Sequence, residues 1–446
     1  MPGRAAAPTL DRMVALCELM GDPQFAAPVI HVTGTNGKGS TVKVIAELLQ
    51  TMGLTVGTFT SPDLESVNER IARNGESISD RELIEQLTAL AALEPLLTQR
   101  PNRFELLAAA AFRYFADTAV DVVVAEVGLG GRWDATNVVL PAVSVVTNVS
   151  EDHLEVLGPT LADVAMEKAG IIKSGSHLIL GETDAGLAQI FIDVADGLDV
   201  PVWRRGASPG DGDFGCDEND VAVGGRLIDV RTPGANYQEV FLGLHGAHQG
   251  DNAACAVAAV EAFFSAPPDE LIVRAALESV RVPGRLEVVG HSPLVVLDGA
   301  HNIAGARALA RSISADFAVD GPVVVVMGLL TGRDPDAMLT AIASTGATEV
   351  IVCHAPSPRG LPVTELLAAA ARVGIPARGA DSVEAACGFA IDVATESGLV
   401  VVCGSLYVVG AARTALLTSR APAPSSPAAF SLQVGEADLD GRASPR

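Results

Sequence analysis

The sequence predicts a two-domain α/β protein with mostly parallel sheets. Short runs rich in Val and Ile alternate with longer Ala- and Leu-rich segments of helical spacing, a pattern typical of βαβ units. A glycine-rich loop follows the first apolar run and leads into a helical segment, and a fresh series of apolar runs begins after residue 287. We therefore expect a P-loop-type sheet domain over residues 1–288 and a smaller Rossmann-like domain over residues 289–420.

The individual elements follow from local patterns. β-Branched apolar runs predict strands, and amphipathic Ala-rich segments predict the helices between them. In the first domain, strands are expected at 29–32, 120–127 and 143–147, and helices at 40–52, 81–97, 104–117 and 253–264. In the second domain, strands are expected at 294–297, 323–327, 349–353 and 399–403. Residues 206–220 predict a solvated loop or irregular hairpin, and residues 421–446 a mobile tail, because both are rich in polar residues, Gly or Pro.

Composition narrows the class of protein. The 446 residues include 30 Lys and Arg against 54 Asp and Glu, a net charge of −24, which argues against nucleic acid or an anionic membrane as a partner. The six cysteines are scattered without a C-x-x-C pair, so we expect packing residues in a reducing compartment. No apolar run is long enough to span a bilayer. The sequence therefore predicts a cytoplasmic protein.

The glycine-rich loop carries the first functional signal. Residues 33–41 read Thr-Gly-Thr-Asn-Gly-Lys-Gly-Ser-Thr between an apolar run and a helical segment. Glycines allow backbone N–H groups to converge on phosphate oxygens, and a helix N-terminus, a lysine and a hydroxyl complete a nucleotide and Mg²⁺ site. The loop departs from G-x-x-x-x-G-K-[ST] because Gly39 stands between Lys38 and Ser40.

A carboxylate at the end of a buried run indicates a metal. Glu126 closes the apolar run 122–125, where an ionised carboxylate without a partner would be costly. With Ser40, it can supply oxygen ligands to Mg²⁺. The next predicted strand leads to Asp152 and His153, at the sheet edge where open α/β sheets bind ligands. A lone histidine is more often structural, and Lys168 by itself is an ordinary lysine or a phosphate contact.

Several motifs together resemble one family. The loop 34–40 resembles the ATP loop of folylpolyglutamate synthases and the related Mur ligases. Further segments resemble the folate branch, namely 60–64 (Thr-Ser-Pro-Asp-Leu), 126–137, 152–153, 167–173, 248–253 and 298–302 (Asp-Gly-Ala-His-Asn). The ordered motifs extend from residue 33 to about 410. One departure is Asp63, which stands where the family usually has His.

The resemblance implies ATP, two Mg²⁺ ions and a set of site residues. It assigns ATP to Gly34, Thr35, Asn36, Gly37, Lys38, Gly39, Ser40, Thr41, Asn252, Arg285 and Asp298. It assigns metal binding to Ser40, Ser61, Glu126 and His153, and a carbamylated side chain to Lys168. It assigns substrate to Phe104, Glu105, Gly130, Gly131, Arg132, Asp152, His301 and Ser405, the last two on the glutamate side. Catalytic roles fall to Lys38, Lys168, Arg285 and His301.

Read alone, several of these residues have plainer interpretations. Asn252 fits a helix cap, Arg285 a surface salt bridge, and His301 and Ser405 loop capping. For Phe104, stacking on a flat heterocycle is the physical reason for a role beside the pterin. Family context is what favours the functional assignments.

The resulting hypothesis is an ATP-dependent amide ligase that activates a folate carboxylate as an acyl phosphate and joins it to L-glutamate. Dihydropteroate is a possible second acceptor, and the resemblance implies a monomer. One alternative is a Mur-type amino-acid ligase, although only 32 residues precede Thr33, where those enzymes carry a UDP-sugar domain. The other alternative is a non-catalytic nucleotide-binding paralogue with an altered substrate, to which Asp63 points.

Overall fold

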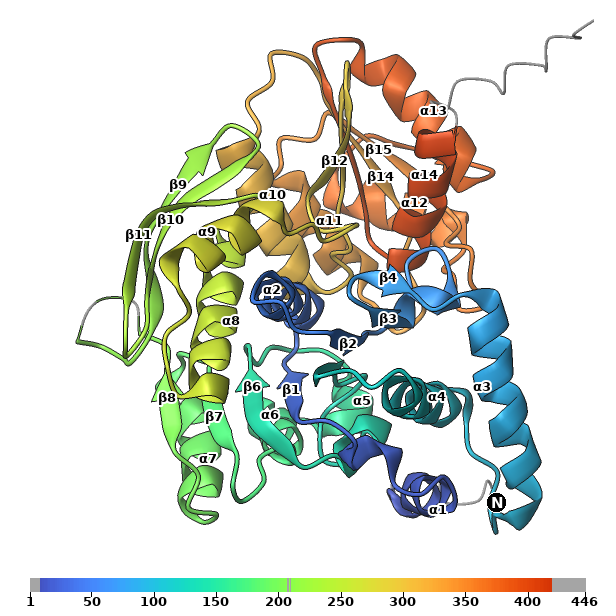
Figure 1. The fold of residues 1–446 in the computed structure, drawn as a ribbon. Helices are drawn as coiled ribbons and strands as arrows, with labels where there is room; N and C mark the ends of the chain where they lie inside the picture. Colours follow the sequence, from blue (N-terminus) through green and yellow to red (C-terminus); the bar gives the residue numbers. More distant parts are fainter. Residues whose placement is uncertain (1–8, 207, 209, 419–446) are drawn as a thin grey trace, which may run out of the picture.

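The computed structural model describes residues 9–206, 208 and 210–418, so the expected tail at 421–446 lies outside the described residues. Two α/β layered units lie one above the other (Figure 1). The lower unit contains an eight-stranded sheet of order β4-β3-β2-β5-β1-β6-β7-β8 with a three-stranded sheet beside it, and the upper unit a six-stranded sheet of order β12-β13-β17-β14-β15-β16. We refer to them as the first and second domains.

The eight-stranded sheet is parallel except at β3 and β4. Its strands are β1 (Val29–Thr33), β2 (Val56–Phe59), β3 (Ile71–Arg73), β4 (Glu76–Ser77), β5 (Val122–Glu126), β6 (Pro141–Val146), β7 (His177–Leu180) and β8 (Val202–Arg204). Because successive side chains alternate between faces, β1 packs Ile30 and Val32 on one side and Val29 on the other. All three strands expected in this domain are confirmed within one to two residues at each end.

Helices cover both faces of this sheet. α2 (Lys38–Thr51), α8 (His248–Phe264) and α9 (Glu270–Ser279) share one hydrophobic cluster with it, and α1 (Asp11–Leu19), α3 (Asp80–Leu93) and α4 (Arg103–Asp117) share the other. α5 (Leu154–Leu157), α6 (Leu161–Ala169) and α7 (Ala185–Asp196) lie by β6 and β7. α8 is buried nearly all round because its alanines allow close packing.

Two predicted helices differ from the structure at their ends. The helix expected over 81–97 ends at Leu93 and continues as a 3-10 turn over Glu94–Leu96, because Pro95 has no N–H to donate to the preceding turn. The helix expected from residue 253 begins five residues earlier, at His248. The polar residues of that first turn, Gln249 and Asn252, hid its start because they break the apolar pattern while being buried.

Of the two alternatives for residues 206–220, a loop or an irregular hairpin, the hairpin is confirmed at the end of the segment, and the loop is wrong there. Its last residues belong to β9 (Gly215–Ala222), which pairs antiparallel with β10 (Gly225–Arg231), itself paired with β11 (Asn236–Leu242). β9 reads Gly-Cys-Asp-Glu-Asn-Asp-Val-Ala and lies at the sheet edge, where backbone pairing holds a strand whose side chains are largely solvent-facing. Such a strand lacks the apolar alternation by which strands are predicted.

The second domain matches its prediction closely. β13 (Leu294–Leu297), β14 (Val323–Met327), β15 (Glu349–Cys353) and β17 (Leu399–Cys403) have the expected bounds, and β12 (Glu287–His291) and β16 (Ala377–Ala380) complete the sheet. α10 (Ile303–Asp316), α11 (Pro335–Ala343), α12 (Val363–Val373), α13 (Val383–Ala394) and α14 (Leu406–Thr418) cover its faces. β12 straddles the boundary expected at residue 288, and that boundary stays a prediction.

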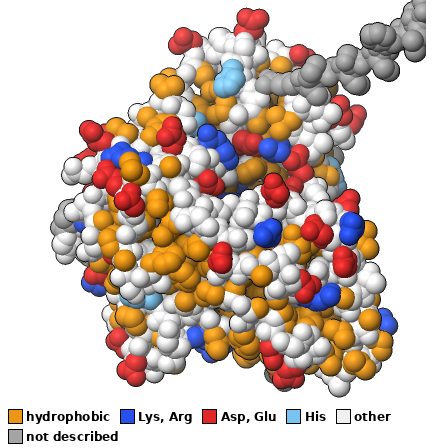
Figure 2. All heavy atoms as spheres, viewed as in Figure 1, with side chains coloured by type: hydrophobic (Ala, Val, Ile, Leu, Met, Phe, Trp, Pro, Cys, Tyr) orange, Lys and Arg blue, Asp and Glu red, His pale blue; other side chains and the backbone are white. Residues whose placement is uncertain are grey.

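Burial and charge agree with the composition. Five of the six free cysteines are buried and Cys216 is partly buried, consistent with packing roles. Burial raises the pKa of each thiol, to about 12 for Cys17 and Cys255. Acidic side chains are scattered over the face in Figure 2. Within the described residues, no helix is both long and apolar enough to cross a membrane.

Candidate active site

A cavity of about 590 Å³ lies between the two domains. Its first-domain walls are the segments that follow β1, β2, β5, β6 and β7, because the carboxyl ends of these parallel strands meet at one edge of the sheet. The second domain supplies Asp298, His301, Arg333 and Ser405, each from a loop at the end of a strand. The cavity is therefore lined by loops at the strand ends of both sheets.

The phosphate loop is fixed by the segment after β6. The backbone N–H groups of Thr35 and Asn36 donate to the carbonyl and side-chain oxygens of Asn148, at 2.9 and 3.0 Å. Thr147 donates its hydroxyl to the Asn36 carbonyl at 2.6 Å. α2 begins at Lys38 after Gly37, whose φ of 84° requires glycine at this turn. The loop is thus rigid, with a helix N-terminus facing the cavity.

The Lys38 side chain lines the cavity and is not part of the hydrophobic core. Its Nζ donates to the Gly34 and Thr35 carbonyls at 3.0 and 3.2 Å, so its charge is held over the loop. Among the described residues, no carboxylate forms an ion pair with this amine. A cation held by weak carbonyl acceptors over converging N–H groups suits a phosphate.

Glu126 is the buried carboxylate of the site. It is 4% exposed, and its Oε2 accepts a hydrogen bond from the Ser61 backbone N–H at 3.1 Å. Burial raises the pKa of Glu126, while the charges of Lys38 and Arg285 oppose that rise. A divalent cation would stabilise the ionised form.

The donor set fits Mg²⁺. Ser40 is 2% exposed in the first turn of α2, and Gly39 lies so close to Glu126 that a Cβ there would stand 3.5 Å from Oε2. Mg²⁺ uses one or two protein carboxylates and completes its octahedron with phosphates and water, which suits one carboxylate beside a hydroxyl.

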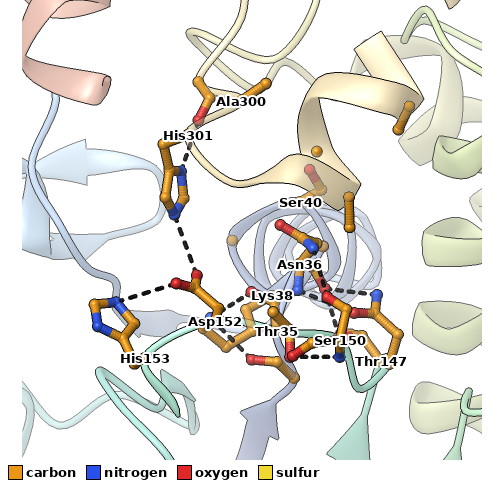
Figure 3. A pocket seen from close by; sticks show the side chains of 18 of the residues that line it. Thr35, Asn36, Lys38, Ser40, Thr147, Ser150, Asp152, His153, Ala300 and His301 are labelled. Atoms are coloured by element: carbon orange, nitrogen blue, oxygen red, sulfur yellow. Dashed lines mark hydrogen bonds and ion pairs between the residues drawn. The ribbon is translucent and has the colours of Figure 1, made fainter. Parts of the chain in front are cut away.

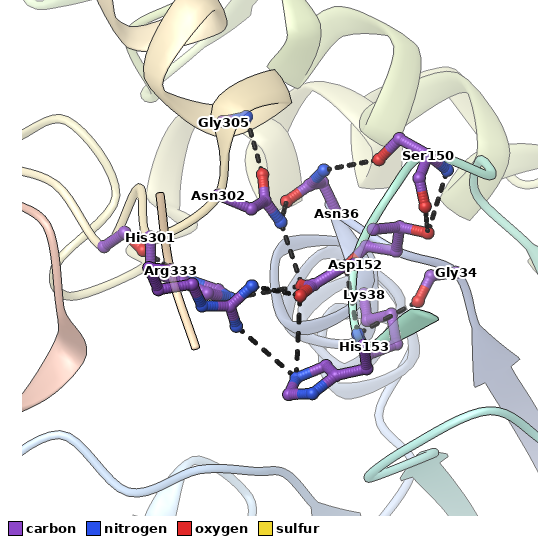
Figure 4. A network of polar contacts seen from close by, with 12 residues as sticks. Gly34, Asn36, Lys38, Ser150, Asp152, His153, His301, Asn302, Gly305 and Arg333 are labelled. Atoms are coloured by element: carbon purple, nitrogen blue, oxygen red, sulfur yellow. Dashed lines mark hydrogen bonds and ion pairs between the residues drawn. The ribbon is translucent and has the colours of Figure 1, made fainter. Parts of the chain in front are cut away.

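Asp152 connects the two domains across the cavity. It forms an ion pair with Arg333, and its Oδ2 accepts a hydrogen bond from Asn302 Nδ2 at 3.0 Å (Figure 4). The rings of His153 and His301 stand on either side of it, at 3.7 and 3.6 Å (Figure 3). Burial alone would raise the pKa of Asp152. Hydrogen bonding from His301 and the charge of Arg333 outweigh that effect and hold this pKa well below its usual range.

Lys168 is a buried cation without a carboxylate partner in the described structure. Its side chain projects from α6, 3% of the residue is exposed, and no described ion pair includes it. Burial, assisted by the charge of Lys38, lowers the pKa of Lys168 to about 7. This shift favours the neutral, nucleophilic form of the amine more than in an exposed lysine.

One wall of the cavity is formed by the first turns of α8. Asn252 Nδ2 donates to Gln249 Oε1 at 3.0 Å, and Gln249 Nε2 has no partner among the described residues. Asn252 also touches the phosphate loop at Gly37, where a Cβ would collide with its side-chain oxygen. Asp298 accepts from the backbone N–H groups of Leu286 and Ala300, both at 2.9 Å, and thereby shapes the loop around Arg285.

The structure brings most predicted site residues together and leaves a few apart. Those that line the cavity are Gly34, Thr35, Asn36, Gly37, Lys38, Gly39, Ser40, Ser61, Glu126, Gly130, Asp152, His153, Lys168, Asn252, Arg285, Asp298, His301 and Ser405. Those outside its lining are Thr41, Phe104, Glu105, Gly131 and Arg132.

The residues outside the lining have contacts of their own. Glu105 pairs with Arg12 at 2.7 Å and forms a capping box with Asn102 at the start of α4. Phe104 packs on the ring of Phe59, 5.7 Å between centroids, and Thr41 is buried in α2. Gly131 packs against the backbone of Lys168, and Arg132 donates its backbone N–H to the Glu167 carbonyl at 2.9 Å. Their assigned binding roles stay predictions.

Sequence reasoning missed several lining residues. Arg333 and Arg359 come from loops of the second domain, and Arg205, Glu182 and His248 come from the first. Two of them had an available signal. Glu182 follows an apolar run at the same sheet edge as Glu126, and His248 opens the segment 248–253 that resembles the family.

Comparison with known proteins identifies the family. Residues 32–260 match the Mur ligase middle domain, and residues 284–406 match the glutamate ligase domain of Mur ligases. The chain is 36% identical over 443 residues to the dihydrofolate synthase/folylpolyglutamate synthase of Mycobacterium tuberculosis, covering 91% of this chain and 90% of that protein. The chain belongs to the folylpolyglutamate and dihydrofolate synthase family of Mur ligases.

Solved structures of this family agree. Folylpolyglutamate synthase of Mycobacterium tuberculosis complexed with ADP superimposes with a TM-score of 0.87 at 37% identity, covering 94% of this chain and 96% of that one. The E. coli enzyme in complex with DHPP and ADP gives 0.84 at 29% identity, covering 94% and 95%. Folylpolyglutamate synthase of Lacticaseibacillus casei is 34% identical over 91% of this chain and 94% of its own length. The predicted α/β fold and the assignment as an ATP-dependent amide ligase are confirmed.

Proposed function

We propose that this family member adds L-glutamate to a folate carboxylate, with dihydropteroate as a second candidate acceptor. The observation that carries the proposal is the shared cavity, in which the phosphate loop of one domain faces His301 and Ser405 of the other. Relatives bearing both activities in their names support it. ATP is the substrate that the family assignment supports. L-glutamate as a partner, the monomeric state and the cytoplasmic location stay predictions.

The residues divide the reaction between them. Lys38 and Arg285 neutralise charge that develops as the folate carboxylate takes the γ-phosphoryl group, and the phosphate loop orients the nucleotide. The glutamate amine then attacks the acyl phosphate and releases phosphate. His301 and Ser405 hold the incoming glutamate. The two domains together exclude water, which would otherwise hydrolyse the acyl phosphate.

Mg²⁺ would be held by Ser40 and Glu126, and a second ion by Ser61, Glu126 and His153. When bound, Mg²⁺ supplies positive charge to the phosphate oxygens. Burial lowers the pKa of His153, which favours the neutral imidazole that a metal ion requires. In this structure Arg333 Nη2 lies 3.5 Å from His153 Nε2, so an ion bound at that nitrogen would displace this contact. Asp63 forms an ion pair with Arg70 at 2.6 Å and so holds the loop that carries Ser61.

Lys168 is proposed to be carbamylated. Its neutral amine can add to CO₂ and lose a proton, which turns a buried cation into an anion. Since the pKa is lowered to about 7, the reactive form increases as pH rises through 7. We expect bicarbonate-dependent activity to rise over that interval, and ¹³C-bicarbonate to give a carbamate NMR signal that Lys168→Met lacks. Lys173→Met is the control, and equal signals in both variants would contradict the modification.

Replacing Gly37 with alanine is expected to raise the Kd for ADP by about ten-fold, because the added Cβ collides with Asn252 and must move it or the loop. Gly53→Ala is the matched control: it has a similar φ of 91° but open space around the new Cβ. Both variants place an alanine in a left-handed conformation, but only Gly37→Ala adds a collision. Titration calorimetry measures the Kd for ADP of each variant. Equal ADP affinities would show that the contact with Asn252 plays no part in binding.

Incorporation of labelled L-glutamate by the purified chain, with ATP and Mg²⁺, tests the function. 7,8-Dihydropteroate and a reduced tetrahydrofolate are offered in separate reactions. Product with both indicates a bifunctional synthase, and product with tetrahydrofolate alone indicates a chain-extending enzyme. Product with neither, although ADP binds, would overturn the proposal in favour of the altered-substrate alternative to which Asp63 pointed.

A further inference from the structure

One helix of the second domain touches the first domain at both of its ends. α10 runs from Ile303 to Asp316, 14 residues, or about 21 Å at 1.5 Å per residue. It begins directly after His301, which lines the active-site cavity, and Asn302, which caps the helix. Its last residue, Asp316, lies at the opposite end, beside the antiparallel sheet β9–β11. We call these two ends the head and the foot of α10.

The head is joined to the first domain by hydrogen bonds of a part-buried amide side chain. Asn302 caps α10 by accepting from the Gly305 N–H at 2.8 Å. Its Nδ2 reaches across the domains to Asn36 Oδ1 at 3.1 Å and to Asp152 Oδ2 at 3.0 Å (Figure 4). Both partners line the cavity, so these contacts lie where substrates bind and leave.

The foot is joined by a buried ion pair. Asp316 Oδ1 lies 2.6 Å from Arg226 Nη1 of β10, with the two side chains 0% and 5% exposed. Asp316 Oδ2 accepts from the backbone N–H of Gly246 at 2.6 Å. Arg226 also donates to the Asn219 carbonyl at 2.6 Å. Both carboxylate oxygens therefore accept hydrogen bonds from the first domain. These bonds are strong because the carboxylate is charged and buried.

The foot also adjoins the helix whose first turns form one wall of the cavity. Gly246 stands two residues before α8, whose first turns carry His248, Gln249 and Asn252 on the cavity wall. One carboxylate thus fixes both the loop that starts α8 and the C-terminal end of α10. A rigid helix converts a shift at its foot into a displacement at its head.

We propose that Asp316 is a positioning residue, which pins the foot of α10 to Arg226 and Gly246 and so places His301 and Asn302 over the phosphate loop. This inference rests on the proposed function, because its consequence is a rate of glutamate transfer. Asp316 touches no reacting atom. Its effect arises because reacting groups lose efficiency steeply when displaced by about 1 Å.

Asp316→Asn separates positioning from folding. Asparagine keeps an oxygen for the Gly246 N–H but removes the negative charge opposite Arg226. We expect kcat at saturating ATP and folate to fall by at least about ten-fold and KM for glutamate to rise, because the head is displaced. The Kd for ADP should stay within about two-fold of the parent value, because the asparagine oxygen still accepts from the Gly246 N–H and so keeps the loop that starts α8.

Asp217→Asn is the matched control. Asp217 of β9 pairs at 3.0 Å with Arg231, which lies in the same strand as Arg226, β10. Both residues of this pair lie within the three-stranded sheet. Its loss removes an Arg–Asp pair from that sheet without touching α10, so kcat should not change. Hydrogen exchange over residues 303–306 gives a readout besides activity, and it should accelerate in Asp316→Asn and not in Asp217→Asn.

The proposal is overturned if Asp316→Asn keeps the parent kcat, or if its ADP affinity falls in step with kcat. If this variant does not fold, Arg226→Gln is measured in the same way, since it removes the other charge and leaves an amide donor for Asp316. If the parent chain itself transfers no glutamate, the proposed function fails, and unchanged exchange at the head of α10 would then refute the positioning role separately.

Discussion

Lys38→Ala is expected to abolish glutamate ligation, with turnover reduced by about a thousand-fold, while the protein stays folded. The loss follows from removing a fixed positive charge at the transferred phosphoryl group, an effect of the size seen when one preorganised donor is deleted. The fold should survive because, in the part of the chain that the structure describes, the hydrogen bonds of Nζ go to carbonyls of its own loop, those of Gly34 and Thr35. Labelled-glutamate incorporation and thermal unfolding by circular dichroism measure the two effects.

Lys173→Ala provides the comparison for Lys38. Lys173 is another partly buried lysine, yet it does not line the cavity. We expect near-parental turnover from it. Near-normal ligation by Lys38→Ala would refute the assignment of the loop to phosphoryl transfer.

Glu126→Gln is expected to lower turnover by about a hundred-fold or more and to leave the free energy of unfolding unchanged or higher. Burial raises the pKa of the carboxyl group, so the ionised form is disfavoured until a cation arrives, and a neutral amide removes that cost. Without the charge, Mg²⁺ loses its protein carboxylate. Mg²⁺ together with ATP should therefore raise the Tm of the parent above the value with ATP alone, and fail to do so in the variant.

Glu261→Gln is a suitable control for Glu126. Glu261 is also 4% exposed, and its Oε1 likewise accepts from one backbone N–H, that of Gly234 at 2.8 Å. It stands outside the cavity lining, so its variant should keep the Mg²⁺-dependent rise in Tm. A parental rise in Glu126→Gln would show that the metal is held elsewhere.

The parts of this fold that are predictable from sequence are those encoded locally. The runs of the second-domain sheet carry their own β-branched signal, and the glycines around Lys38 carry theirs, so strand bounds and loop agree with the structure. The bounds of β9 could not be predicted, because the strand is held by backbone pairing at a sheet edge and most of its side chains are polar. A hydrophobic pattern predicts only those elements that bury side chains, and β9 buries few.

The site divides in the same way. Glu126 was predictable because a carboxylate ending an apolar run stands out in one segment. Asn302 and Arg333 were not assigned to the site, because their meaning depends on Asp152, which lies 150 and 181 residues away along the chain. Glu105 shows the converse, since its sequence motif is also that of a helix cap, the contact that the structure displays.

The buried cysteines allow the opening of each domain to be followed by the reactivity of its own thiols. With thiol pKa values raised by burial, almost no thiolate exists in the native protein at neutral pH, so alkylation must wait for the chain to open. Cys17 and Cys255 lie in the first domain, while Cys353, Cys387 and Cys403 lie in the second. The order in which these thiols become reactive therefore records which domain opens first, without any added label.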